Sequence, residues 1–152
     1  MADLVVLASD GSDLSINALK AGAAIVPADS RFVIVTVMHD TDPMLMSGAG
    51  IAGGVATPEE VETLDKLNQD DANEVVMKTR AGLGMGNLEA HVLRGEVATA
   101  VCEFAKEHGA AAIVIGSRGR GGFKRAILGS VSDFVVRHAP CPVIVTGHEV
   151  AD

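Results

Sequence analysis

The chain reads Ala-Ala-Ile-Val-Ile-Gly-Ser-Arg-Gly over residues 111–119 and Gly-Ser at residues 129 and 130. The apolar, β-branched run predicts a buried strand over 110–115, and a helical pattern follows from Ser130 to His138. A strand, a glycine-rich loop and a helix in this order are typical of α/β proteins that hold phosphate. Glycines let backbone N–H groups approach an anion, and the helix start adds unpaired donors and a positive dipole end.

The loop between this strand and helix is also the most basic part of an acidic chain. Four of the twelve Lys and Arg residues lie there, at Arg118, Arg120, Lys124 and Arg125, although the net charge is −8. The pattern therefore predicts a nucleotide or phosphate site rather than a mobile basic loop. It is not a P-loop, because the chain contains no Gly-Lys pair.

A second glycine pattern, Gly-x-Gly-x-x-Gly at residues 48–53, does not carry the same meaning. It does not open a helix, since the next helix is expected to begin at Thr57, with Pro58 at its first position and Glu60 completing a capping box. A dinucleotide fingerprint needs a helix start directly after a strand. Residues 41–56 are interpreted as a flexible connection.

The remaining pattern alternates strands and helices along the whole chain. On the first helix we expect a buried stripe of Leu14, Ala18, Ala21, Gly22 and Ile25, and on the second a stripe of Val61, Leu64, Ala72 and Val75. Strict alternation predicts an α/β fold, a Rossmann-like doubly wound domain over residues 1–152 with a five-stranded parallel sheet in the order 3-2-1-4-5 and helices on both faces. The expected strands are 4–8, 32–38, 88–93, 110–115 and 143–146, and the expected helices are 13–26, 58–81, 97–108 and 130–138.

Two polar loops stand out, residues 9–12 after the first strand and residues 116–129 after the fourth. Ligands of open α/β sheets bind at the carboxyl ends of strands where the strand order reverses. In the order 3-2-1-4-5 these two loops would face each other across one crevice, so they predict one site.

Composition narrows the class of protein. The core must be aliphatic, because hydrophobic residues make up 48% and aromatic residues only 3%. The acidic balance argues against nucleic acid or an anionic membrane as a partner. Cys102 and Cys141 have no metal-ligand spacing, are interpreted as free thiols, and indicate a reducing compartment. With scattered histidines, no signal peptide and no membrane span, we expect a soluble cytoplasmic protein without a metal centre of its own.

The spacing Gly116-x2-Gly119-x9-Gly129-Ser130 resembles the ATP-binding signature of the universal stress protein family. Residues 6–12 are similar to that family's first strand and turn, and residues 139–145 to its last strand. The resemblance implies an ATP-binding stress-response protein that is usually a homodimer, paired through the strand at 143–146. That strand would be an uncovered apolar edge, which invites pairing with another chain.

The resemblance also implies a role for each site residue. Asp10 would contact the ribose, Val37 would present its backbone to adenine, and any Mg²⁺ would arrive on the phosphates near Asp10. Asp10 could instead be only a turn former, and Ser130 only an N-cap. The nucleotide-binding set it implies is Ala8, Ser9, Asp10, Val37, Ile115, Gly116, Ser117, Arg118, Gly119, Gly129, Ser130, Val131 and Ser132.

Two functions fit these residues, a nucleotide-responsive binding module and a slow ATPase or nucleotidyl-transferring enzyme. Catalysis needs a positioned base near the reacting phosphate. Neither polar loop contains Glu or His, and Asp10 would lie nearer the ribose than the γ-phosphate. The sequence therefore favours binding with little or no turnover.

Overall fold

The computed structural model describes residues 2–38, 57–117 and 128–147. The Gly-x-Gly-x-x-Gly pattern and the whole 41–56 connection lie outside these residues, as do Arg118, Gly119 and the rest of the basic cluster. The described elements, in chain order, are β1 (Leu4–Ala8), α1 (Asp13–Ala23), β2 (Arg31–Met38), α3 (Pro58–Leu83), β3 (Glu89–Arg94), α4 (Val97–Glu107), β4 (Ala112–Gly116), α5 (Ser130–His138) and β5 (Val143–Thr146).

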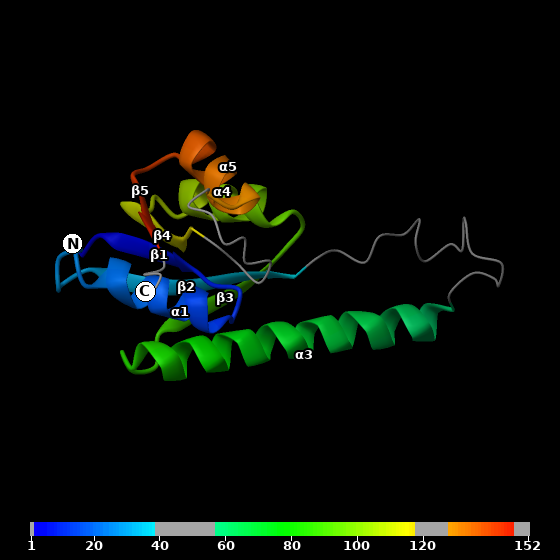
Figure 1. The fold of residues 1–152 in the computed structure, drawn as a ribbon. Helices are drawn as coiled ribbons and strands as arrows, with labels where there is room; N and C mark the ends of the chain where they lie inside the picture. The colour runs from blue at the N-terminus through cyan, green and yellow to red at the C-terminus, as the bar shows by residue number, and fades with distance from the viewer. Residues whose placement is uncertain (1, 39–56, 118–127, 148–152) are drawn as a thin grey trace, which may run out of the picture.

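The five strands form one parallel sheet in the order β3-β2-β1-β4-β5, which confirms the predicted fold. Helices α1 and α3 cover one face of the sheet, and α4 and α5 cover the other (Figure 1). β1 lies at the centre, where Ala8 pairs with Val35 of β2 on one side and with Ile115 of β4 on the other. The strand order therefore reverses between β1 and β4.

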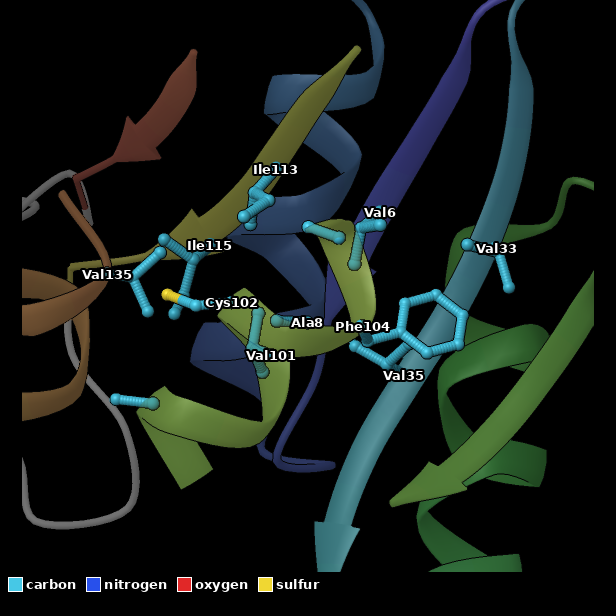
Figure 2. Packing of buried hydrophobic residues seen from close by; sticks show 12 residues of the cluster. Val6, Ala8, Val33, Val35, Val101, Cys102, Phe104, Ile113, Ile115 and Val135 are labelled. Atoms are coloured by element: carbon cyan, nitrogen blue, oxygen red, sulfur yellow. The ribbon is translucent and has the colours of Figure 1, made fainter. Parts of the chain in front are cut away.

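Two aliphatic clusters, one on each face, hold the layers together. Alternate strand residues such as Val6, Val35 and Ile113 pack under α4 and α5, where Val101, Phe104 and Val135 complete the cluster (Figure 2). Their neighbours in the strands, such as Leu7, Ile34 and Val114, turn to the opposite face and pack with Leu19 and Leu83. A parallel sheet buried on both faces explains why the central strands β1 and β4 read as continuous apolar runs.

The buried stripe of α1 differs from the predicted one. Ile16 and Leu19 are buried, Ala21 is exposed, and Ile25 is 71% exposed because α1 ends at Ala23, before the proline that the sequence suggested as its stop. The Ala24 N–H closes the helix on the carbonyls of Lys20 and Gly22, so Ile25 lies beyond its last turn.

Only the C-terminal half of α3 packs on the sheet, and this corrects a second prediction. Ala72, Val76, Thr79 and Leu83 are buried, whereas Leu64 is 42% exposed and Val61 and Val75 are half-buried. A 26-residue helix extends about 39 Å, longer than strands of 4–8 residues. The N-terminal half of α3 therefore projects past the ends of the strands (Figure 1). Its predicted capping box between Thr57 and Glu60 is present.

Candidate functional site

The candidate site lies where β1 and β4 end side by side. Since Ala8 pairs with Ile115, the polar loop after β1 and the loop after β4 leave the sheet at the same edge. The first loop leads to α1 on one face, and α5 lies on the other face (Figure 1). This arrangement is the topological switch point that binds ligands in open α/β sheets.

The loop after β1 is a tight turn built on Asp10. One carboxylate oxygen of Asp10, Oδ1, accepts hydrogen bonds from the Ser12 backbone N–H at 2.8 Å and from the Ser12 hydroxyl at 2.6 Å. The Ser12 hydroxyl in turn accepts from the Ser15 N–H at 3.1 Å and caps α1. Asp10 is therefore a turn former, as one sequence interpretation expected, and it stands half-buried at the carboxyl end of β1.

Gly11 is the residue of this turn that cannot be replaced without strain. Its φ is +81°, and an added Cβ would lie 2.9 Å from Cγ2 of Val75 on α3. The turn therefore rests directly on α3.

Ser9 connects the same turn to β2 and to α3. Its backbone N–H donates to the Val35 carbonyl at 3.0 Å, and its hydroxyl lies 2.7 Å from the hydroxyl of Thr79. The Gly11 N–H donates to the Ser9 hydroxyl at 3.1 Å. The Ser9 side chain thus points toward the α3 side of the sheet, while Ala8 packs on the α4 and α5 side. Sequence reasoning missed Thr79, although a threonine within a stripe of Ala72, Val76 and Leu83 was a detectable signal.

The two ends of the segment between β4 and α5 meet at Ser117. The Ser117 N–H donates to the Thr146 carbonyl at 3.0 Å, and the Ser117 carbonyl accepts from the Gly129 N–H at 2.8 Å. The hydroxyl of Ser132, a buried residue, lies 3.3 Å from the same carbonyl and donates to the Gly129 carbonyl at 3.0 Å. These contacts fix the start of α5 against the end of β4.

The first turn of α5 presents backbone donors. Gly129 is the N-cap, and no side chain among the described residues caps this helix. The alternative that Ser130 is the N-cap is wrong, because Ser130 is the first helical residue and is exposed. The backbone N–H groups of Ser130, Val131 and Ser132 lie in the turn where an α-helix has no internal acceptors. Such a helix start can bind an anion.

Val37 on β2 has its main chain in a suitable place for a ligand contact. The Val35 carbonyl faces β1, and the Met38 carbonyl faces β3, where it accepts from the Gly95 N–H. Because alternate residues of a strand face the same neighbour, the main-chain groups of Val37 face the β1 side, two residues past the last β1 pair. Ile115 is buried and Gly116 half-buried at the end of β4.

The perturbed titratable groups lie elsewhere. Burial raises the pKa of the Cys102 and Cys141 thiols, and both are free, as expected from their spacing. A hydrogen bond from Arg94 lowers the pKa of Asp65, and hydrogen bonds from His91 and Arg31 lower that of Glu89. Within the described ranges, no three His, Cys, Asp or Glu side chains gather in a way that could hold a metal ion. Nor does any described helix have the length and hydropathy to cross a membrane.

The strand order defines a doubly wound α/β domain. At its switch point the turn after β1 lies beside the start of the helix that follows β4. The model of the universal stress protein family matches residues 1–147, and the chain belongs to that family. Universal stress protein YxiE of Bacillus subtilis is 31% identical over 95% of this chain and 99% of its own length. Universal stress protein MJ0531 of Methanocaldococcus jannaschii is 29% identical over 93% and 79%.

Solved structures share the fold. Universal stress protein UspA from Lactobacillus plantarum superposes with a TM-score of 0.71 at 24% identity, covering 95% of this chain and 97% of its own. A family member from Arabidopsis thaliana was solved with AMP bound, with a TM-score of 0.62 at 18% identity and coverage of 97% and 93%. The universal stress protein from Archaeoglobus fulgidus was solved in complex with dAMP, with a TM-score of 0.55 at 24% identity and coverage of 96% and 98%. A further universal stress protein was solved in complex with cAMP, with a TM-score of 0.61 at 22% identity and coverage of 96% and 97%.

Proposed function

We propose that this universal stress protein binds ATP at the β1/β4 edge and serves as a nucleotide-responsive stress-response module with little or no turnover. The observation that carries the proposal is the anchoring of the α5 start to the end of β4 through the Ser117 carbonyl. It puts the N–H groups of residues 130–132 at the same edge of the sheet as the Asp10 turn. The AMP, dAMP and cAMP complexes of structures with this fold support an adenine nucleotide as the ligand class.

The proposed nucleotide lies across the carboxyl edge of the sheet. Adenine contacts the main chain of Val37, the ribose contacts Asp10, and the phosphates contact the N–H groups at the start of α5. Ala8, Ser9, Ile115, Gly116 and Ser117 line the path between them, and Arg118 and Gly119, outside the described residues, complete it. Mg²⁺, where present, arrives on the phosphates near Asp10.

Binding without efficient turnover is favoured over a slow ATPase or a nucleotidyl-transferring enzyme. A catalytic site needs a base that can reach the attacking water or hydroxyl. Residues 9–12 and 116–129 supply neither Glu nor His, and Asp10 already uses Oδ1 to hold its own turn. The proposed output is therefore a change of state on binding, not a product.

We further propose a cytoplasmic homodimer joined through β5, which lies at the edge of the sheet. The Pro142 carbonyl accepts a hydrogen bond from the Ile113 N–H of β4, and the Thr146 carbonyl accepts one from the Ser117 N–H just after β4. The main-chain groups of Val143 and Val145 therefore face away from β4. No described strand pairs with this side of β5, which suits an antiparallel, two-fold contact with the same strand of a second copy.

The test of the ligand is mass spectrometry of nucleotide released from freshly purified, denatured protein, followed by calorimetric titration of nucleotide-free protein. Recovery of ATP and its binding with at least micromolar affinity, about −8 kcal/mol, support the proposal. Recovery of AMP or a cyclic nucleotide alone would keep the site and change the ligand. Absence of any bound or titratable adenine nucleotide would refute it.

A further inference from the structure

A chain of buried hydrogen bonds runs from the Asp10 turn into α3. The Gly11 N–H donates to the Ser9 hydroxyl at 3.1 Å, the Ser9 and Thr79 hydroxyls are 2.7 Å apart, and the Thr79 hydroxyl donates to the Val75 carbonyl at 2.7 Å. An N–H can only donate and a carbonyl can only accept. We call these three hydrogen bonds the relay. Because the Thr79 hydroxyl gives its proton to the Val75 carbonyl, the Ser9 hydroxyl must donate to Thr79.

Helix packing alone does not explain the hydroxyl of Thr79. Thr79 has no solvent exposure and occupies the same stripe of α3 as Ala72, Val76 and Leu83. Valine has nearly the same shape, and a buried polar group is costly unless it is hydrogen-bonded. The use of the hydroxyl beyond its own helix is its contact with Ser9, which lies 70 positions away in the sequence.

The relay ties the turn to α3, and two further contacts tie it to β2 and to Val75. The Ser9 N–H is fixed to Val35 of β2, and Val75 of α3 packs under Gly11. Asp10 lies between Ser9 and Gly11, and its carboxylate is oriented by Ser12. Both neighbours of Asp10 are thus tied to Thr79 through Ser9, so a shift of Thr79 would be passed to the backbone on either side of Asp10.

We infer that Thr79 is a positioning residue for nucleotide binding: through Ser9 it fixes the Asp10 turn and so sets the selectivity of the site for ribose hydroxyls. This inference rests on the proposed function, in which Asp10 contacts the ribose. Thr79 itself does not touch the ligand, and its effect reaches the ligand only through the geometry of the turn.

The experiment is a calorimetric comparison of ATP with 2′-deoxy-ATP and 3′-deoxy-ATP. In the wild type, losing the hydroxyl that Asp10 holds should weaken binding about tenfold or more, as expected for a hydrogen bond to a charged group. In Thr79→Val, ATP binding should weaken about tenfold, and the difference between ATP and that deoxy analogue should shrink to about threefold or less. Thr79→Ser keeps a hydroxyl and should restore the wild-type ratio.

Two further variants separate positioning from stability. Val76→Ala removes a buried side chain from the same helix without cutting the relay, so it should lower the melting temperature and keep the wild-type ratio. Should Thr79→Val not fold, Ser9→Ala cuts the same relay from the other end and should show the same loss of ribose selectivity.

The outcomes distinguish the two claims. A wild type that binds ATP with ribose selectivity, together with a folded Thr79→Val or Ser9→Ala that keeps this selectivity, overturns the inference alone. A Val76→Ala variant that loses selectivity as fully as Thr79→Val also overturns it, because any loosening of α3 would then suffice. A wild type that binds no adenine nucleotide overturns the proposed function and this inference with it.

Discussion

The carbonyl of Ser117 accepts a hydrogen bond from the N–H of Gly129 at 2.8 Å, so the loop after β4 ends where it began. This contact explains why residue 129 is a glycine. Its φ of −63° suits any residue, but an added Cβ would lie 3.2 Å from the Ser117 carbonyl oxygen. Space, and not backbone conformation, favours glycine here, because a Cβ would fit only if the Ser117 carbonyl moved by a few tenths of an ångström.

We therefore expect Gly129→Val to weaken ATP binding by at least about tenfold. A branched side chain would push α5 away from Ser117 and stand where phosphate approaches, removing one or two charge-assisted hydrogen bonds of about 1.5–3 kcal/mol each. Calorimetric titration of ATP measures the loss. A matched control is Gly147→Val, since a Cβ at residue 147 has no described neighbour within 4 Å. Unchanged ATP affinity in a folded Gly129→Val would remove α5 from the site.

Turnover should be negligible. The two loops of the site offer no Glu or His as a general base, so phosphate release from ATP should stay far below the order of 10 per second of a typical enzyme. A coupled phosphate assay with purified protein measures this, with the Gly129→Val variant showing the background from contaminants. A rate near that of a typical enzyme that disappears in Gly129→Val would favour the enzyme reading.

The proposed dimer can be tested by one proline. Val145→Pro removes an N–H that faces away from β4, so we expect the assembly to dissociate to the 15.6 kDa monomer in light scattering at micromolar concentration. Val145→Ala keeps the N–H and is the matched control for the lost side chain. Charge at Ile144 is a poorer test, because Ile144 packs on the cluster under α1 and lies 3.5 Å from a Cβ placed at Gly22. A wild type that is monomeric would refute the pairing.

Gly22 in α1 gives a prediction that runs against helix propensity. Alanine for glycine inside a helix normally adds about 0.5–1 kcal/mol of stability. Here the new Cβ would lie 2.3 Å from Cγ1 of Val114 in the core, and overpacking costs about 1–3 kcal/mol. We expect Gly22→Ala to lower the melting temperature by about 2–6 °C in calorimetry.

The control for Gly22 is a double-mutant cycle. In a Val114→Ala background the same Gly22→Ala change should be neutral or stabilising, because the added methyl group then fills space. An equal loss of stability in both backgrounds would show that the contact with Val114 is not the cause.

The sheet could be predicted from sequence because its physical signal is local. Runs such as residues 32–38 are apolar at every position except Thr36, and a sheet covered on both faces favours such runs. The meeting of the two polar loops then followed from the strand order, without any knowledge of side-chain contacts. The free cysteines and the capping box of α3 were predictable for the same reason.

The parts that sequence reasoning missed depend on where elements end and on what lies across the chain. Leu64 fits a helical stripe, yet it is exposed because α3 extends beyond the sheet at that point. Ile25 belongs to the α1 pattern but lies past the last turn. Thr79 stands out in the apolar stripe of α3, but its partner Ser9 lies 70 positions away in the sequence, and no periodicity identifies that partner.

The central claim, an adenine nucleotide seated between the Asp10 turn and the start of α5, is tested most directly by NMR titration of the backbone amides with ATP. We predict that the amide signals of Gly11, Ser130, Val131 and Ser132 shift together and that all four saturate with the same dissociation constant, in the micromolar range or below. The signals of exposed residues on the projecting half of α3, such as Leu67, should stay in place. Signals that do not move, or that move only away from residues 9–12 and 129–132, would contradict the account.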